Sequence, residues 1–246
     1  MRPFKFPWQL LSGSILLGSL FTTQAQAAIV ISGTRVIYPS DQKEVSVKLD
    51  NTGKVPLLVQ SWIDDGDQRS TPDTSTAPFV LTPPIARVNA GQGQTLRVRL
   101  TGQQKLPQDK ESIFWLNVLE VPPTVEDGQN KLNIAFRNRI KLFYRPAGLK
   151  EEIEQAAQKM QWRLKNNAGN WVLEGVNTTP YFLTLNSIKV GNASAELNLA
   201  SSMFAPDERK TLPLKGAYSP SGGSRIEGGV INDYGGISKF EFPAVF

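Results

Sequence analysis

Cysteine and histidine are both absent from the 246 residues of this sequence. Without cysteine the chain forms neither disulfides nor thiolate nucleophiles, and without histidine it lacks the base of Ser-His and Cys-His catalytic sites. The common ligand sets for zinc and copper are missing for the same reason. We therefore expect no metal site and no cofactor, and a fold that is stabilised by core burial alone.

Strong charge patterning is absent as well. The formal net charge is +5, and the Lys and Arg residues are scattered rather than gathered in runs. Basic and aromatic residues do not interleave in the way that is typical of nucleic-acid-binding proteins, so nucleic acid is not expected as a partner. After residue 27 no apolar stretch is long enough to span a bilayer, so we expect no membrane insertion.

Residues 1–27 have the layout of a secretory signal peptide. Arg2 and Lys5 precede an apolar core that two glycines interrupt, and the segment ends in the small-x-small sequence AQA. The core is short and broken for a membrane span, so an uncleaved anchor is the less favoured interpretation. We expect cleavage before Ala28, which leaves an exported chain of 246 − 27 = 219 residues with a net charge of 5 − 2 = +3. That length suggests two domains of about 100 residues each.

The first half of this chain predicts an immunoglobulin-like β-sandwich. Short β-rich runs recur with turn signals such as NTG, DDGD and TPP between them. About seven such runs in about one hundred residues is the spacing of that fold. Trp62, in the third run, is expected to lie in the core. The runs are residues 29–31, 45–49, 57–63, 79–81, 95–100, 113–119 and 132–144.

Three aspartates, Asp64, Asp65 and Asp67, surround Gly66 in the DDGD turn. A calcium loop would need a glutamate that closes the expected spacing, and the sequence has none there. A solvated hairpin turn is therefore favoured over a calcium site.

The second half also predicts β-structure. Residues 149–160, LKEEIEQAAQKM, are the only segment with helical composition, and we expect a short helix or linker there. The expected domains are thus residues 28–148 and 149–246, the second being a smaller β-sandwich or barrel. Its expected strands are residues 162–164, 171–176, 181–190, 195–199, 210–214, 224–231 and 237–242.

Residues 132–146, LNIAFRNRIKLFYRP, predict a long strand that is apolar in its first part and basic further along. Leu132, Ile134 and Phe136 alternate with residues of the other parity, which indicates one apolar face. The remainder is basic before it becomes apolar again. We interpret the stretch as a binding edge that is apolar at one end and carries cations further along, namely Arg137, Arg139 and Lys141.

Three motifs in this order resemble those of a known family. They are LPQDKESIFWLNVLEVPP at residues 106–123, IKLFYRP at 140–146 and INDYGG at 231–236. With TPPIARVNAG at 82–91, the resemblance covers essentially the whole exported chain. The sequence is similar to the periplasmic pilus chaperones of the chaperone–usher pathway, the PapD-like family. The short connection at 121–131, which lacks cysteine, resembles the short-loop branch of that family.

The resemblance implies a fold, a location and partners. The fold is all-β, with two immunoglobulin-like sandwich domains in a boomerang arrangement, and the location is the periplasm. The partners are fimbrial (pilin) subunits with an incomplete immunoglobulin-like fold and an outer-membrane usher that receives them for pilus assembly. Apart from the resemblance, an exposed apolar edge is expected to self-associate or to be capped in the free protein, for example in a self-capping dimer. Donor-strand complementation by residues 132–144 would fold and cap each subunit.

The resemblance also implies roles for individual side chains. Leu132, Ile134 and Phe136 match the apolar residues that enter the subunit's groove, although from the sequence alone they could face this protein's own core. Arg35, in the first strand, and Lys141 match the pair that anchors the subunit's C-terminal carboxylate. Without the resemblance, two solvated surface cations would be favoured. The members of a buried charge cluster between the domains are matched by Glu111, Arg145 and Asp233.

Lys141 differs in parity from the apolar row. Leu132, Ile134 and Phe136 are even-numbered, so in a regular strand Lys141 points to the opposite face. A β-bulge or a strong twist at residues 138–140 would bring the two groups to one side.

Two other classes of protein compete with a chaperone. One is a structural fimbrial subunit or adhesin with immunoglobulin-like domains, but such subunits are shorter, usually carry a cysteine pair and lack their last strand. The other is an enzyme with paired carboxylates, such as Asp64 with Asp67 or Glu151 with Glu152 in a glycosidase-like role. These pairs lie in a turn and in a charged linker, so we expect no enzymatic activity.

Overall fold

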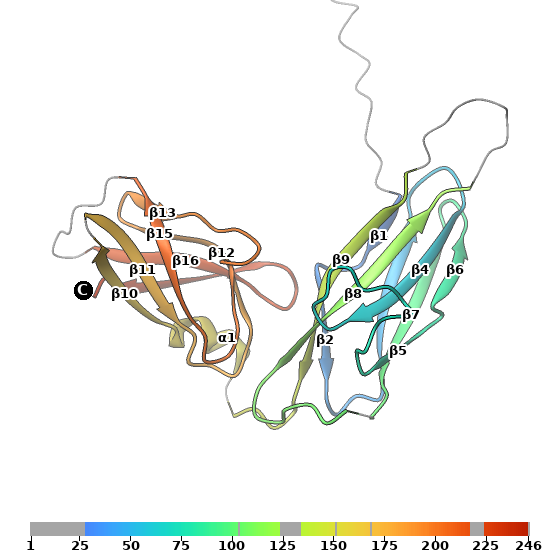
Figure 1. Cartoon of the computed structure of the whole chain (residues 1–246), viewed down its shortest axis with the longest axis horizontal. Coiled ribbons are helices and arrows are strands. Elements are labelled where there is room, and N and C mark those ends of the chain that lie inside the picture. Colours follow the sequence, from blue (N-terminus) through green and yellow to red (C-terminus); the bar gives the residue numbers. More distant parts are fainter. Residues whose placement is uncertain are drawn as a thin grey trace, which may run out of the picture.

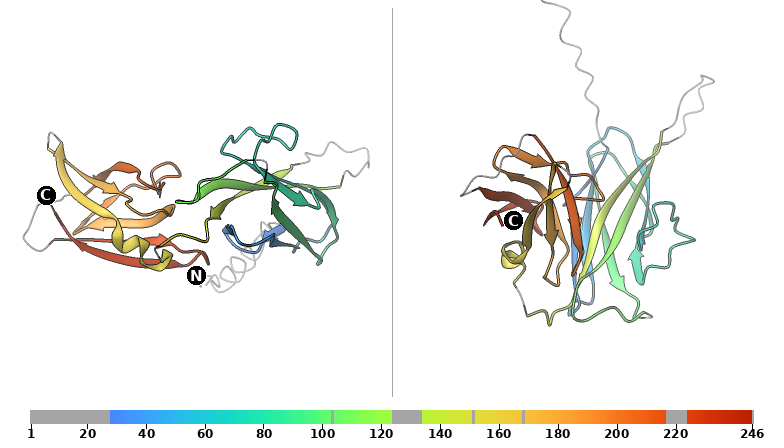
Figure 2. Two further views of the ribbon diagram at one scale, coloured as in Figure 1. Left: turned by 90° about the horizontal axis from the view of Figure 1, so that it is seen from below. Right: turned by 60° about the vertical axis from the view of Figure 1, so that its left-hand side comes forward.

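The computed structural model describes residues 28–102, 104–123, 134–150, 152–167, 169–216 and 224–245. These residues form two β-domains that meet at one end, so the molecule has the outline of an open V (Figure 1). Two further views show the domains as distinct bodies (Figure 2). The expected signal at residues 1–27, Leu132 and Glu151 lie outside the described residues. No helix in the described ranges is long and apolar enough to cross a membrane.

The N-terminal domain is built from two sheets. One has the strand order β1 (Ile29–Ile31), β3 (Val45–Asn51), β7 (Gly93–Leu100) and β5 (Phe79–Thr82). The other has the order β2 (Arg35–Pro39), β9 (Phe136–Arg145), β8 (Ser112–Val121), β4 (Leu57–Asp64) and β6 (Ile85–Val88). Between them, Leu49 and Val98 of the first sheet share one buried core with Leu116 and Leu142 of the second. Each such side chain contributes about 2–3 kcal/mol by leaving water.

The C-terminal domain has a hydrophobic core of its own. It begins with the short helix α1 (Ile153–Ala156) and a 3₁₀ turn at Ala157–Lys159. The strands follow the order β10 (Gln161–Asn167), β11 (Asn170–Val176), β15 (Arg209–Lys215), β13 (Ala193–Ala195), β12 (Leu183–Val190), β16 (Arg225–Ile231) and β17 (Ile237–Pro243), and β14 (Met203–Phe204) pairs with β12. Fully buried Leu173, Phe204 and Leu212 belong to its core, in which the ring of Trp162 stacks on that of Phe240.

The pairing of β9 decides where the molecule has an open strand edge. On one side β9 pairs with β8 in antiparallel fashion, in unbroken register from Phe136 to Tyr144. On the other side it pairs in parallel with β2, but only from Lys141, opposite Arg35, onward. Within the described ranges, residues 136–140 therefore have no strand on that second side. We call this segment the free edge of β9.

The expected two-domain β-fold is confirmed, with local corrections. Three short strands, β2, β6 and β14, were not among the expected runs. Arg35 begins β2 rather than lying in the first strand, because the chain bends at residues 32–34 and crosses from one sheet to the other. The expected strand at 195–199 is wrong beyond Ala195, since Asn198 accepts hydrogen bonds from the backbone N–H of Ala200 and Ser201 and forms a turn.

Trp62 is buried, as expected, but not in the core between the sheets. It lies in β4, in which Val59 and Ile63 belong to that core and Trp62 has the opposite parity. Its indole therefore occupies the outer face of the five-stranded sheet, where the guanidinium of Arg137 lies 5.8 Å from the ring centre. The short helix expected within residues 149–160 is present as α1 and the 3₁₀ turn.

Candidate binding site at the domain junction

Lys141 lies on β9 of the N-terminal domain, at the junction with the C-terminal domain. Its Nζ donates a hydrogen bond of 3.0 Å to Oγ1 of Thr184 in β12 of the C-terminal domain. Burial, together with the positive charges of Arg35 and Lys210, lowers the pKa of Lys141 to about 8. Within the described part of the chain no carboxylate pairs with this ammonium group. Lys141 is therefore a half-buried cation without a counter-charge.

Arg35 is the parallel-strand partner of Lys141 in the β2–β9 register. Its Nη1 donates a 2.8 Å hydrogen bond to the carbonyl of Ile231, and its buried Nε has no acceptor among the described residues. Burial lowers the pKa of Arg35, and the charges of Asp233 and Glu111 offset part of that effect. Two half-buried cations on adjacent strands form a site that suits a small anion such as a carboxylate.

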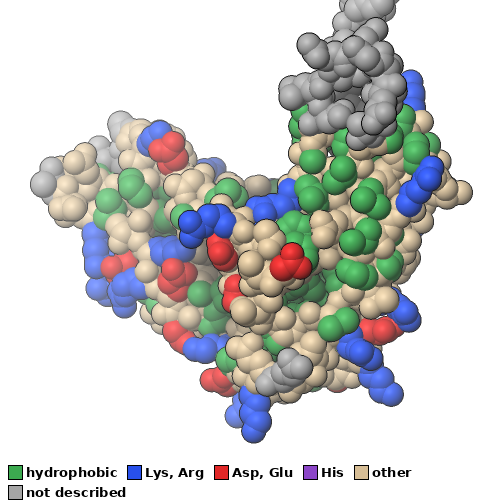
Figure 3. All heavy atoms as spheres, turned by 45° about the vertical axis from the view of Figure 1, so that its right-hand side comes forward, with side chains coloured by type: hydrophobic (Ala, Val, Ile, Leu, Met, Phe, Trp, Pro, Cys, Tyr) green, Lys and Arg blue, Asp and Glu red, His purple; other side chains and the backbone are tan. Residues whose placement is uncertain are grey.

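This cationic site lies where the two domains meet. A space-filling view shows a notch between the domains, with Lys and Arg side chains gathered near its base (Figure 3). The ring of Phe143 packs against the site. The guanidinium of Arg35 lies 5.8 Å from the centre of this ring, and the ring of Phe182 in the C-terminal domain lies 5.8 Å from it. The structure thus brings together the two cations that were expected to anchor a carboxylate.

Arg145, four residues further along β9, has the opposite surroundings. Its Nε donates to Glu111 at 2.7 Å, and its two terminal nitrogens form a bidentate pair with Asp233 at 2.5 and 2.9 Å. The backbone N–H of Phe182 donates to the second oxygen of Glu111 at 2.8 Å. Burial alone would lower the pKa of Arg145, but the hydrogen bonds and charges of Asp233 and Glu111 raise it. The three residues expected to form an interdomain cluster are in contact across the junction.

The apolar end of β9 projects from the N-terminal domain. Ile134 is 50% exposed and Phe136 is 62% exposed, whereas Ile140 and Leu142, of the same parity, contact the core. Phe136 therefore continues the inner face of the sheet beyond the point where the opposite sheet covers it. Ile134 lies two residues before β9 begins, so the expected start of this strand before Phe136 is wrong for residues 134–135. Neither Ile134 nor Phe136 faces this protein's own core, which was the alternative left open by the sequence.

The difference in parity between this row and Lys141 is real. The bulge suggested at residues 138–140 is wrong, because every residue of β9 from Phe136 to Tyr144 pairs with β8 in one continuous register. Even-numbered residues lie on the inner face of the sheet, and odd-numbered ones lie on the outer face with Lys141. One strand thus presents an apolar row and a cationic row on opposite faces, and a partner along its free edge would meet both.

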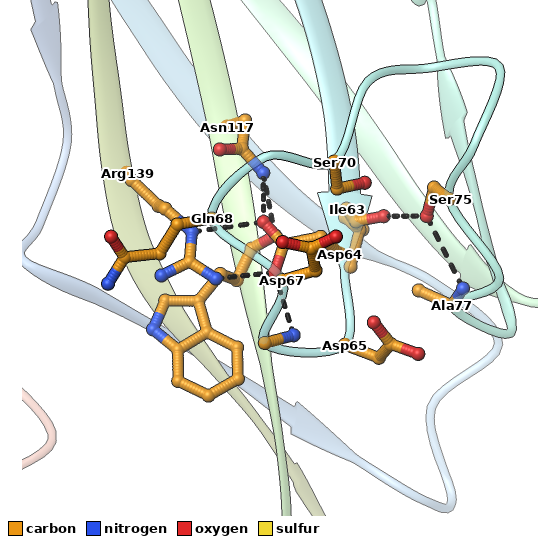
Figure 4. A network of polar contacts seen from close by, with 12 residues as sticks. Ile63, Asp64, Asp65, Asp67, Gln68, Ser70, Ser75, Ala77, Asn117 and Arg139 are labelled. Atoms are coloured by element: carbon orange, nitrogen blue, oxygen red, sulfur yellow. Dashed lines mark hydrogen bonds and ion pairs between the residues drawn. The ribbon is translucent and has the colours of Figure 1, made fainter.

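Arg139 and Arg137 occupy the outer face next to Lys141. Arg139 forms hydrogen bonds of 2.5 and 3.0 Å with buried Asp64, which also accepts from Asn117 at 2.7 Å (Figure 4). Desolvation would raise the pKa of Asp64, but these hydrogen bonds and that of the Gly66 N–H lower it. Asp64 is therefore a structural ion-pair partner. Asp65 and Asp67 accept from Thr76 and Arg69 within the loop. The expected solvated hairpin turn is wrong, because Asp64 is buried and the strands before and after this loop, β4 and β5, belong to different sheets.

Sequence reasoning missed Thr184 and the partner of Arg139. Thr184 is a single hydroxyl residue in the alternating strand β12, and nothing in its sequence context distinguishes it. Asp64 and Arg139 lie 75 residues apart, so only the pairing of β4 and β9 with β8 brings them together. The other members of the expected site are placed as described above, except Leu132, which lies outside the described residues.

Known protein families match both domains of this chain. The family profile for the pili and flagellar-assembly chaperone PapD N-terminal domain matches residues 28–150, and that for the pili assembly chaperone PapD C-terminal domain matches 155–242. The probable fimbrial chaperone YadV of Escherichia coli K12 is 42% identical over 220 residues, 88% of this chain and 89% of that protein. The chaperone protein FimB/FhaD of Bordetella pertussis is 43% identical over 234 residues, 93% of each chain.

Solved structures show the same similarity. The crystal structure of the YadV chaperone has a TM-score of 0.75 and 40% identity, covering 88% of this chain and 99% of that one. The Salmonella enterica SafA pilin in complex with the SafB chaperone gives a TM-score of 0.75 and 31% identity, covering 89% of this chain and 98% of the matched one.

Two immunoglobulin-like domains with an open strand edge beside the unpaired cation Lys141 suit a protein that binds other chains. The chain belongs to the PapD-like family of pilus assembly chaperones. It is a fimbrial chaperone and not an enzyme, as the motifs predicted.

Proposed function

We propose that this chaperone binds the C-terminal strand of a pilin subunit along the free edge of β9 and holds the subunit's terminal carboxylate between Arg35 and Lys141. The observation that carries the proposal is that the free edge, residues 136–140, ends at Lys141, which has no carboxylate partner among the described residues, and at its strand partner Arg35. A terminal carboxylate supplies that charge and accepts hydrogen bonds from both side chains. At an effective dielectric of ~20, each contact at ~4 Å contributes about 4 kcal/mol before desolvation.

The position of the free edge fixes the direction of the bound strand. The edge lies on the N-terminal side of Lys141, and β2 occupies the same side from Lys141 onward. A strand whose last residue reaches Lys141 must therefore enter at Phe136 and run parallel to β9. Its backbone then pairs with the unpaired backbone groups of β9, as in other cases of strand addition.

The apolar row supplies the hydrophobic part of binding. Ile134 and Phe136 are exposed at the start of β9, so a subunit that lacks a strand can bury them in its own open core. Leu132 extends the row by one more residue of the same parity. Burying one such side chain fully stabilises the complex by about 1.5–3 kcal/mol. In the absence of a subunit, the row favours a self-capping dimer.

The interdomain cluster has a positioning role in this proposal. Lys141 and Arg35 belong to the N-terminal domain, whereas Thr184 and Ile231, their hydrogen-bond acceptors, belong to the C-terminal one. The ion pairs of Arg145 with Glu111 and Asp233 fix the two domains, and so the two halves of the anchor site, relative to each other. The proposed domain limits, 28–148 and 149–246, are supported by family matches at 28–150 and 155–242.

Export and delivery complete the proposal. Residues 1–27 act as a cleaved signal peptide that sends the chain to the periplasm, and the loaded chaperone passes its subunit to an outer-membrane usher. Membership of the pilus assembly chaperone family supports both steps. The SafA pilin in complex with the SafB chaperone supports a pilin as the class of cargo.

Co-purification of the chaperone with a pilin subunit tests the anchor. Lys141→Ala and Arg35→Ala should each abolish recovery of the complex, because removing one member of a desolvated charge pair costs about 2–5 kcal/mol. Circular dichroism should show that both variants remain folded. Lys48→Ala, which removes an exposed cation from β3, is the matched control and should leave the yield unchanged. An undiminished yield with Lys141→Ala would sink the anchor assignment.

The same assay tests the apolar row. Ile134→Asp should weaken subunit capture without unfolding the chaperone, because this side chain is half exposed in the free protein. Unfolding of the variant would instead show that Ile134 belongs to the chaperone's own core.

A further inference from the structure

The three cations on the outer face of β9 have unequal surroundings. Lys141 belongs to the proposed anchor, and the charge of Arg139 is neutralised by Asp64 at 2.5 and 3.0 Å. Arg137 has only neutral partners among the described residues. Its Nη2 donates to the carbonyl of Gln68 at 2.6 Å, and its guanidinium lies 5.8 Å from the ring centre of Trp62.

We propose that Arg137 selects an acidic side chain in the terminal strand of the subunit, at the position that pairs with it a few residues before the carboxylate. This inference rests on the proposed function, because the anchor at Lys141 sets the register of the bound strand. It adds a charge preference at one defined position to a recognition site that otherwise uses a carboxylate and apolar side chains.

The geometry of strand pairing brings the acidic side chain to Arg137. Paired residues of adjacent strands point to the same face, as Arg35 and Lys141 do. A strand added to the free edge therefore places alternate side chains beside Arg137 and Arg139 on the outer face, and the others beside Phe136 and Asn138 on the inner face. Arg137 precedes Lys141 by four residues, which corresponds to about 13 Å along a strand.

The guanidinium of Arg137 retains donors for this contact. A guanidinium carries five N–H donors, and one of them is used within the described residues. Trp62 and Gln68 lie toward β4, on the side of β9 away from the free edge. Because the Arg137 side chain is exposed, it can turn toward the free edge and bind a carboxylate there in bidentate fashion.

The neutralised charge of Arg139 helps to define which position of the bound strand favours an acidic residue. Asp64 is buried and already bonded to Arg139, so an acid in the subunit that pairs near Arg139 meets a compensated ion pair and a nearby negative charge. The ring of Trp115 covers the guanidinium of Arg139 at 4.6 Å. In the bound strand, the favoured acidic residue thus lies beside Arg137 on the outer face, and the apolar residues lie on the inner face.

A series of synthetic peptides tests the proposal with the mature full-length chaperone. The host peptide alternates Val and Thr and ends in a free carboxylate, and each member of the series carries one Glu at a different position upstream of its end. We expect one Glu position to bind about two- to fivefold more tightly than the host, the range for a well-placed surface ion pair. Glu at the adjacent positions, which face the apolar row, should weaken binding.

Variants assign the gain to Arg137. In Arg137→Gln the favoured Glu should lose its advantage, while the host peptide binds as before. Arg99→Gln, which removes an exposed arginine from β7 in the opposite sheet, changes the net charge equally and should preserve the advantage. The advantage should also shrink when salt is raised, because the pair is partly exposed.

The possible outcomes separate this inference from the proposed function. If the host peptide binds and its C-terminally amidated form does not, the anchor stands. A Glu series without a favoured position, or an advantage that survives in Arg137→Gln, then overturns only the role of Arg137. If neither the host peptide nor any Glu peptide binds, the proposed function fails, and this inference fails with it.

Discussion

Lys141 and Arg145 lie on the same face of one strand, four residues apart, in opposite electrostatic surroundings. Arg145 is bonded to two carboxylates, Glu111 and Asp233, whereas Lys141 is bonded to the hydroxyl of Thr184. The pKa of Arg145 is raised and that of Lys141 is lowered. Burial acts against the charge of both side chains, so the difference arises from their partners.

The comparison distinguishes a structural cation from one that is available for binding. A buried charge that is already paired has little to gain from a ligand, while an unpaired one gains the whole interaction when a counter-ion arrives. The ion pairs of Arg145 therefore stabilise the domain junction, whereas the positive charge of Lys141 has no carboxylate partner among the described residues. Four changes test this distinction, beginning with the largest expected effect.

Arg145→Met should lower the free energy of unfolding by about 3–5 kcal/mol, because it leaves buried Glu111 and half-buried Asp233 without their cation. Urea denaturation followed by circular dichroism measures the change. Arg209→Met, which removes an exposed arginine from its ion pair with Glu174, is the matched control and should cost far less. Equal losses in the two variants would contradict a structural role for Arg145.

Thr184→Asp should give Lys141 the internal carboxylate that Arg145 already has. The aspartate would compete with the subunit's carboxylate, and we expect the affinity for a pilin to fall about a hundredfold or more. Surface plasmon resonance with an immobilised subunit measures it. Thr184→Asn has a similar size without charge and should change affinity only slightly. An unaltered affinity in Thr184→Asp would show that Lys141 is not the anchor.

Lys141→Met should stabilise the free protein by about 1–3 kcal/mol at pH 7, since it removes an unfavourably buried charge that is partly screened by solvent. The ordinary pKa of 10.5 falls to about 8 in the folded state, so between these values the unfolded state binds more protons and stability rises with pH. The gain from Lys141→Met is thus present below pH 8 and disappears above 10.5. Thermal melts against Lys48→Met check it, and a loss of stability would refute the argument.

The affinity for a free carboxylate should fall as the pH rises above about 8. A bound carboxylate raises the pKa of Lys141. Binding therefore takes up a proton when the pH exceeds the pKa of Lys141 in the free protein. Between pH 7 and pH 9 we expect about a tenfold weakening of peptide binding. Isothermal titration calorimetry in buffers of different ionisation enthalpy measures affinity and proton uptake together. In Lys141→Arg the pH dependence should vanish, because arginine stays charged.

Most of the fold could be predicted because its strands carry their signal locally. Leu49 and Val98 alternate with polar neighbours, and such alternation needs no knowledge of the partner strand. The short strand β6, Ile85–Val88, was missed because four residues give too little periodicity. The break between β1 and β2 was missed because it depends on which sheet each half joins, which is a long-range property.

The site was predictable only where a family motif contained it. Composition and periodicity alone leave Arg35 and Lys141 as two ordinary cations, and the resemblance to a family selected them. The parity of Lys141 against Phe136 was visible in the sequence, but its explanation required the continuous β8–β9 register. The contrast between Arg137 and Arg139 required Asp64, which lies 75 residues from Arg139 and reaches it only in the folded chain.

β2 lies against β9 from Lys141 onward, so it blocks the continuation of the free edge. A polypeptide that enters along residues 136–140 meets Arg35 and the start of β2 directly in line with it. In the proposed complex the edge therefore has a closed end, which suits a chain terminus rather than an internal segment of a longer chain. Ordinary open sheet edges accept any compatible strand and promote aggregation. Here the chaperone's own backbone would restrict the bound strand to one that ends near Lys141.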